Sequence, residues 1–466
     1  MTSLSEAQSG QGRHHSAGRH HHHHHHHLPH GLVTAPRRVS RWVEPWFLSY
    51  TCLGIVQGGM LPLVLPLSSG SASEAGIVVG VMNLAGLTAP YWGHLADRRR
   101  LHRQVLLAGM LVILFPLLLL PIELGFPLKV ALACLLGLGF AAANTVANMF
   151  IVEVRPQDEW DARIGALQAL CGVGQVAGLL LAGVLGGRYA LAYGVAAALT
   201  AAAVPLAWLT LRGVHVEVPR SAATAHAPHG GEGWAGSPQR HFHIPTWSGM
   251  LKLLGEVETP FVHLQVIWFM AFVAIGAVLT MFPLAIVEKF SASAGLPATT
   301  YAFASVITLA VFPVAANLAK QYGEPSILGA GLLIRGIAMA FLGAGFFTAD
   351  GVYIAPISVG LLVIAWPLLG VSGTALTAQL APHDKGEALG FFNASTSLAG
   401  AVGAFLGGWA MQKVGFGTLC AIGSGVVVLS ALSSLGLRSS GLWIPLPARL
   451  AREVEMSGHQ DTNERS

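Results

Sequence analysis

The chain is 466 residues long and has a formal net charge of +4, yet only 10% of its residues are charged and 53% are hydrophobic. Typical globular proteins have about 25% charged residues, so this composition excludes an ordinary soluble protein of several domains. The small excess of basic residues follows membrane topology, as shown below, and it does not predict a nucleic-acid partner.

The first 43 residues are polar and low in complexity, with an unbroken histidine run from His20 to His27. Neutral imidazole binds divalent metals, so the run is either a metal-binding tract or an expression tag. We expect a disordered cytoplasmic tail here and leave it out of the functional prediction. The rest of the chain shows no pattern that predicts a cofactor or a metal site.

Twelve apolar segments follow, each long enough to cross about 30 Å of hydrocarbon as a helix. The first six are expected at 45–65, 74–95, 103–122, 128–151, 163–187 and 189–211. The second six are expected at 260–287, 298–319, 326–347, 351–379, 387–411 and 414–436. The predicted fold is therefore an all-α membrane protein with twelve transmembrane helices in two six-helix bundles, at 44–211 and 259–437. A polar linker at 212–258 joins the bundles, and a polar tail at 438–466 ends the chain.

The two halves repeat each other. The letters MLPL at 60–63 recur as MFPL at 281–284. A second set recurs 225 residues later: Gly165, Gln168, Gly178 and Gly183 correspond to Gly390, Asn393, Gly403 and Gly408. Parallel repeats of about six spans build many secondary transporters, because a substrate site forms where the repeats meet.

The basic residues divide unequally between the two faces of this layout. Of the 26 Lys and Arg, 21 lie on the face of the termini. Four lie on the opposite face, namely Lys129, Arg188, Lys289 and Lys413, and one, Arg335, lies within a span. The positive-inside rule therefore places both termini and the central linker in the cytoplasm, with the protein in the cytoplasmic membrane.

The loop after the second span reads GHLADRRRLHR, from Gly93 to Arg103. It resembles the signature of the major facilitator superfamily, Gly-x-Leu-Ala-Asp-Arg followed by Gly and further basic residues. The resemblance extends over about 45–436 through the repeat, the number of spans and the long central linker. The sequence departs from the signature at Arg100, where the family usually has Gly.

The resemblance implies a gate on the cytoplasmic side. Asp97 is expected to meet the amino-terminal end of the eleventh span near Gly386 and to hold the halves together in the outward-open state. Gly93 is expected to permit close helix approach. Arg98 and Arg100 complete the motif, although topology alone also explains these arginines.

Polar residues inside the spans are the candidates for a substrate cavity. They are Gln57, Asn83, Asn144, Asn148, Gln168, Gln265 and Asn393, with Trp268 and Trp366 as aromatic walls. In the family, helices one, four, seven and ten line the central cavity, which favours Gln57, Asn144, Asn148 and Gln265. Hydrogen bonding between helices, at about 0.6–2 kcal/mol per contact, is the alternative interpretation.

Arg335 is the one full charge inside a predicted span. Facing the cavity, it would attract an anionic substrate; however, ninth helices in this family are peripheral and arginine can reach the interface, so a structural role is preferred. No Asp or Glu lies near the middle of a predicted span. Proton coupling is therefore not supported, and the coupling ion stays unassigned.

The sequence predicts a monomeric transporter in the lipid bilayer, not an enzyme, that moves a small-molecule substrate by alternating access. Efflux of amphipathic or drug-like compounds is the first expectation, because the cavity is expected to be apolar and aromatic with few charges. One alternative is uptake or facilitated transport of a neutral metabolite such as a sugar. The other is a membrane sensor that keeps the fold without transport.

Overall fold

The computed structural model describes residues 43–99, 101–122, 125–155, 160–212, 260–380 and 385–437. Within these ranges every regular element is a helix, and twelve helices are long and apolar enough to cross a membrane. Their ends differ from the predicted ends by three residues or fewer. The all-α fold with twelve spans is thus confirmed. The histidine run, most of the predicted linker and the carboxyl-terminal tail lie outside the described residues.

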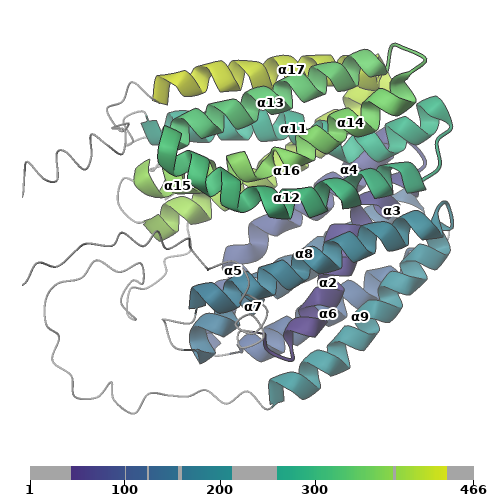
Figure 1. Ribbon diagram of the computed structural model, residues 1–466. Helices are drawn as coiled ribbons and strands as arrows, with labels where there is room; N and C mark the ends of the chain where they lie inside the picture. Colours follow the sequence, from purple (N-terminus) through teal and green to yellow (C-terminus); the bar gives the residue numbers. More distant parts are fainter. Residues whose placement is uncertain are drawn as a thin grey trace, which may run out of the picture. The chain divides into compact units, whose positions relative to one another are not determined.

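Six spans make up the first half, and some of them consist of more than one element (Figure 1). In chain order the elements are α2 (Phe47–Gly54), η1 (Ile55–Met60), α3 (Leu61–Leu67), α4 (Ala72–Leu84), η2 (Ala85–Thr88), α5 (Ala89–Arg99), α6 (His102–Leu119), α7 (Phe126–Val154), α8 (Trp160–Leu185) and α9 (Tyr189–Arg212).

Six further spans make up the second half (Figure 1). The elements are α11 (Pro260–Phe290), α12 (Gly295–Tyr322), α13 (Glu324–Gly345), α14 (Gly351–Ile364), α15 (Trp366–Leu380), α16 (Lys385–Val414), α17 (Phe416–Ser433) and η4 (Ser434–Leu437). Each half has its own hydrophobic core. Three alanines of the second half, Ala298, Ala302 and Ala404, pack into the core of the first, and Leu67, Ala72 and Ala75 of the first half pack into the core of the second.

The connections lie on two faces because successive spans alternate in direction. We call the face where span one begins the terminal face and the opposite one the loop face. Loop-face connections are short, and two of them depend on glycines in the left-handed region, Gly186 at φ 59° and Gly415 at φ 84°. Gly186 lies in the tight turn expected between spans five and six.

Three of the described spans depart from regular α-helix within their length, and in span two the departure is the 3₁₀ segment Ala85–Thr88. Residues Ile55–Met60 of span one form a π-helical turn, and Pro62 and Pro66 follow it. Span ten is broken at Ala365, because Pro367 has no N–H to donate to the carbonyl of Val363. The hydroxyl of Thr308 on α12 lies 3.4 Å from that carbonyl oxygen, and its closer acceptor is the carbonyl oxygen of Ala304 at 2.8 Å.

Glycines set how closely the helices pack. A Cβ at Gly178 of α8 would overlap the carbonyl oxygen of Ile55, and one at Gly59 would lie 2.5 Å from the Cα of Gly178. Spans one and five therefore touch backbone to backbone. This is the close packing of small residues that drives helix association in lipid.

Contacts between the halves loosen from the loop face to the terminal face. On α8 a Cβ at Gly183 would lie 2.9 Å from Ala298 of the second half, one at Gly172 would lie 3.7 Å from Leu309, and one at Gly165 would meet nothing within 4 Å. These three glycines share one face of α8, because their spacings are close to whole helical turns.

The repeat-related face of α16 shows the same series. A Cβ at Gly408 would lie 2.9 Å from the Cα of Gly76, Ser397 lies 3.4 Å from a Cβ at Gly86, and a Cβ at Gly390 would meet nothing within 4 Å. The halves are therefore packed together near the loop face and diverge toward the terminal face.

The packing of spans one and five gives a first prediction. Gly178→Ala should lower the melting temperature by several degrees, since overpacking typically costs 1–3 kcal/mol, roughly. The matched control is Gly194→Ala on α9, where a Cβ meets nothing within 4 Å and alanine is the better helix former. Thermal unfolding of the detergent-solubilised protein measures both. Equal melting temperatures for the two variants would contradict this packing.

Candidate functional site

A cavity of about 660 Å³ lies between the two halves. Both halves contribute to its wall. The first half provides Gln57, Met82, Asn83, Gln175 and Leu179, among others, and the second provides Phe272, Tyr301, Ser305, Arg335, Trp366 and Thr396. Amide side chains thus face the cavity from the first half, and aromatic rings and one guanidinium face it from the second.

Irregular backbone places three of the expected residues in this wall. Gln57 lies in the π-helical turn of span one, and Trp366 is the first residue after the break in span ten. Asn83 comes just before the 3₁₀ segment Ala85–Thr88 of span two. Irregular backbone at membrane depth is tolerated where it lines a cavity or is buried in protein, and π-bulges are frequent at functional sites.

The family pattern led us to expect Asn144 and Asn148 in the wall of the cavity, but they do not line it. Among the described residues, α7 contributes nothing to the wall. Asn144 instead lies behind Gln57. The Asn144 Nδ2 donates to Gln57 Oε1 at 2.9 Å, and the Tyr50 hydroxyl donates to Asn144 Oδ1 at 2.9 Å. This fixes the carbonyl of Gln57 and leaves its amide NH₂ for the cavity.

Asn148 and Gln168 form a second link, in which Gln168 Nε2 donates to Asn148 Oδ1 at 3.1 Å. The amide of Asn148 also donates to the backbone oxygen of Asn144 at 3.0 Å. Gln168 is exposed and, like Asn148, lies outside the cavity wall. The bond from Gln168 joins α8 to α7 and corresponds to the interhelical alternative that the sequence left open, whereas the bond to Asn144 lies within α7.

Gln265 and Asn393 are also absent from the wall. Gln265 is 3% exposed, and neither of its amide atoms has a hydrogen-bond partner among the described residues. It is enclosed near the beginning of α11, where Phe261, Leu264 and Trp268 are buried as well. Asn393 is exposed on α16. Gln265, which the family pattern favoured as a cavity residue, is therefore enclosed by protein outside the described wall.

Trp268 supports the wall from behind. Its ring stacks on Phe272 with centroids 4.2 Å apart, and its indole N–H donates to the Thr396 hydroxyl at 2.8 Å. Phe272 in turn meets Trp366 edge to face at 5.6 Å. Since Phe272, Trp366 and Thr396 all line the cavity, Trp268 fixes their positions without being part of the surface.

Arg335 was a candidate for the cavity, with a structural role near the interface as the preferred alternative. It does not extend to the interface; the side chain is 3% exposed and lines the cavity. Its guanidinium lies over the Trp366 ring, 5.6 Å from the centroid. Glycines permit this placement, because a Cβ at Gly336 would meet Val428 of α17 at 2.6 Å and one at Gly331 would overlap Leu369 of α15. Span nine is thereby packed between its neighbours instead of lying free in lipid.

A buried ion-pair cluster at the terminal face was not expected from the sequence. Glu44, 5% exposed, accepts from Arg155 through Nε and Nη2, both at 3.0 Å, and from Arg163 Nη1 at 2.8 Å. The Trp46 indole N–H also donates to it, at 3.1 Å. The cluster joins the beginnings of spans one and five to the end of span four. The only sign of this cluster in the sequence was that one acidic residue and two arginines lie at the ends of predicted spans.

The structure gives only part of the expected gate. A Cβ at Gly93 would lie 3.2 Å from Met149 Sδ and 3.4 Å from Thr145, so this glycine sits closely against α7. Arg98 is exposed near the end of α5. Arg100 lies outside the described residues, and the surroundings of Asp97 and Gly386 are not described either. The gate therefore stays a prediction.

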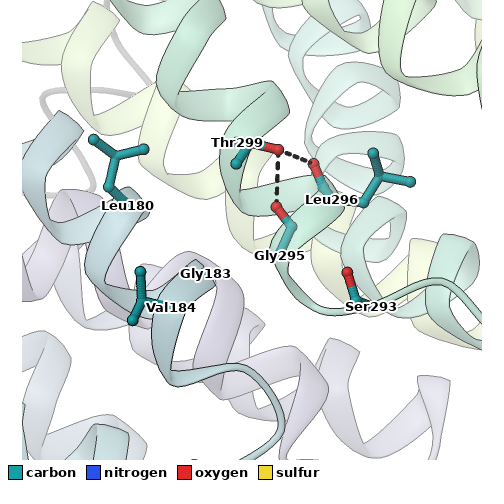
Figure 2. A pocket seen from close by; sticks show the side chains of 7 residues that line it. All are labelled: Leu180, Gly183, Val184, Ser293, Gly295, Leu296 and Thr299. Carbon is teal, nitrogen blue, oxygen red and sulfur yellow. Dashed lines mark hydrogen bonds between the residues drawn. The ribbon is translucent and has the colours of Figure 1, made fainter.

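A second pocket of about 440 Å³ lies between α8 and α12 at the loop face (Figure 2). Leu180 and Val184 form one side, and Ser293, Leu296 and Thr299 form the other. The Thr299 hydroxyl donates within its own helix, to the carbonyl oxygen of Gly295 at 2.9 Å or of Leu296 at 3.1 Å, as the dashed lines in Figure 2 show. None of the described residues that line this pocket has an amide or a charged side chain, so it is a weaker candidate than the central cavity.

Comparison with known proteins supports a transporter fold. A family model described as Major Facilitator Superfamily matches residues 46–366. Among solved structures, a mutant of the nucleoside transporter NupG is 12% identical, with a TM-score of 0.67 and coverage of 86% of this chain and 99% of that one. An auto-inhibited POT family peptide transporter is 15% identical, with a TM-score of 0.66 and coverage of 88% and 98%. A D-xylose–proton symporter is 19% identical, with a TM-score of 0.58 and coverage of 85% and 96%. The search of curated protein sequences found no match.

The ion-pair cluster generates a stability prediction. Glu44→Gln removes the carboxylate that both guanidiniums bind and should lower the free energy of unfolding by about 3 kcal/mol, as expected when a buried pair is broken. Glu288→Gln, at an exposed position near the end of α11, is the control and should change it by less than about 0.5 kcal/mol. SDS-induced unfolding in mixed micelles measures both. A loss at Glu44 no larger than at Glu288 would show that the cluster does not stabilise the fold.

Proposed function

We propose that this chain, which belongs to the Major Facilitator Superfamily and is a multi-pass membrane transporter, exports small amphipathic solutes by alternating access, acting as a monomer. The observation that carries the proposal is the cavity of about 660 Å³. It lies between the halves, where a solute contacts both at once. Its wall is mainly apolar and aromatic, which suits an amphipathic solute better than a strongly hydrated one.

The graded contacts between the halves support an alternating mechanism. Contacts near the loop face are close, and those near the terminal face are open. By the positive-inside rule the terminal face is cytoplasmic, so this conformation receives its solute from the cytoplasm. The outward-facing conformation then requires the reverse, with the halves closed at the terminal face and apart at the loop face.

Asp97 is proposed to stabilise that second conformation. A carboxylate at the end of α5 is favourable next to the amino terminus of a helix from the other half, and α16 begins at Lys385 on the same face. Gly93, one turn earlier, keeps this end of span two against α7. The exposed Arg98 and the neighbouring Arg100 hold the loop at the cytoplasmic interface.

One alternative has an observation in its favour. Gln57, Asn83 and Gln175 present amides to the cavity, and amides suit the hydroxyl groups of a neutral metabolite. The similar structures include a nucleoside transporter and a D-xylose–proton symporter, although at such low identity they share only the fold. Uptake of a neutral metabolite is therefore the second candidate, and a sensor that does not transport is the third.

Counterflow in proteoliposomes separates these candidates. Vesicles loaded with an unlabelled amphipathic compound should accumulate the labelled compound faster than empty vesicles, while labelled sugars should not accumulate. Accumulation of sugars alone would favour the second candidate. If no compound in a broad panel accumulates above protein-free vesicles, transport is refuted and the sensor is favoured.

The gate gives a separate prediction. Asp97→Asn should reduce counterflow at least tenfold, because the outward-facing state loses its charged contact, and reconstitution should be unchanged. Asp350→Asn, at an exposed position on the loop face, is the matched control and should leave flux unaltered. Equal flux in both variants would remove Asp97 from the gate.

A further inference from the structure

The geometry points to a solute with a single negative charge, a carboxylate, that binds the guanidinium of Arg335 while its apolar body lies against Phe272 and Trp366. This inference rests on the proposed transport function and names the substrate class of the same cavity.

Charge is the first argument. Among the described residues that line the cavity, Arg335 is the only one charged at neutral pH, and none is Asp, Glu, Lys or His. Among the described residues, the ion pairs are those of Glu44 with Arg155 and with Arg163, in the cluster at the terminal face. The cavity therefore has a positive charge that no protein carboxylate in its wall balances.

Burial makes this charge significant. The Arg335 side chain is 3% exposed, and its Nε has no hydrogen-bond partner among the described residues. An unpaired buried charge is strongly unfavourable, and the interaction with the Trp366 ring at 5.6 Å offsets only part of that cost. An anionic solute supplies the missing charge and hydrogen-bond acceptors together.

The shape of the guanidinium favours a carboxylate as the partner. Its planar N–H groups match the two oxygens of a carboxylate in parallel hydrogen bonds, which are stronger and more directional than bonds between neutral groups. A cation in the same place would be repelled in a medium of low dielectric constant. A neutral solute would leave the guanidinium unpaired.

The rest of the wall describes the other parts of the solute. Phe272 and Trp366 form an aromatic surface next to Arg335, and Trp268 holds Phe272 in place by stacking. Gln57 and Asn83 lie across the cavity on the first half. The carboxylate and the apolar body of an aromatic or aliphatic acid therefore contact the second half, and a polar group at its other end contacts the first. The solute thus bridges both halves.

The test uses matched ligands that differ only in head-group charge. Purified full-length protein is titrated with 3-phenylpropionate, 3-phenylpropionamide and 3-phenylpropylammonium, and with the acid, amide and amine of naphthylacetic and octanoic bodies. Binding is measured by thermal shift and by tryptophan fluorescence. For at least one body, the acid should bind at least tenfold more tightly than its amide, equivalent to about 1.4 kcal/mol, and the amine should bind more weakly still.

Variants then assign the preference to one side chain. Arg335→Gln should abolish the difference between acid and amide, whereas Arg335→Lys should keep part of it because the charge remains. Arg188→Gln, at an exposed loop-face position, is the control and should keep all of it. Size-exclusion profiles and ligand-free melting temperatures identify any variant that fails to fold. If Arg335→Gln fails to fold, the test rests on Arg335→Lys.

Four results would overturn the inference: no acid in the series binds, amides or amines bind as well as acids, Arg335→Gln keeps the acid preference, or Arg335→Lys loses all of it while folded. Counterflow separates this from the proposed function. If the wild type transports neutral or cationic compounds but binds no acid, transport stands and the anionic class fails. If acids bind through Arg335 and no compound in the panel moves, the class stands and transport fails.

Discussion

Backbone contact between the two halves at the loop face is the constraint on which the cavity depends. Gly76 and Gly408 join span two to span eleven, and Gly183 meets Ala298 to join span five to span eight. Lipid tails are as apolar as the helices, so there is little hydrophobic gain from bringing the halves together, and close packing must supply the attraction. Because the same helix faces lose contact toward Gly165 and Gly390, the halves enclose a space open toward one side.

The polar side chains within the spans have two different roles. Asn144 and Asn148 are used within the first half, where Asn144 holds Gln57 of span one and Asn148 accepts from Gln168 of α8, so that interhelical hydrogen bonds link α7 to its neighbours. Arg335 has no such partner among the described residues and faces the cavity. In lipid an unsatisfied polar group is costly, so a group left without a partner next to a cavity is the one available to a solute.

Periodicity and repeat were enough to predict the fold, since twelve apolar segments and a duplicated glycine pattern depend only on local sequence. The position of the candidate site residues could be predicted only in part. Gln57, Asn83, Trp366 and Arg335 line the cavity, whereas Asn144, Asn148 and Gln265 do not, because helix rotation decides which face of a span meets the cavity. The placement of Arg335 depends on Gly331 and Gly336, which let span nine pack closely against α15 and α17, and no pattern within that span reveals this. The pairing of Glu44 with Arg155 and Arg163 joins positions far apart in the sequence, so local patterns could not predict it.

Pulsed electron-resonance distances in nanodiscs test most directly whether the halves rock as two rigid bodies about the cavity. Spin labels at Gly165 and Gln321 report on the terminal face, and labels at Val184 and Thr299 report on the loop face, in a background without the four native cysteines. Gly408→Val places bulk in the closest loop-face contact. The account predicts that this substitution lengthens the Val184–Thr299 distance and shortens the Gly165–Gln321 distance. A loop-face distance that lengthens while the terminal-face distance stays fixed or also lengthens would contradict it.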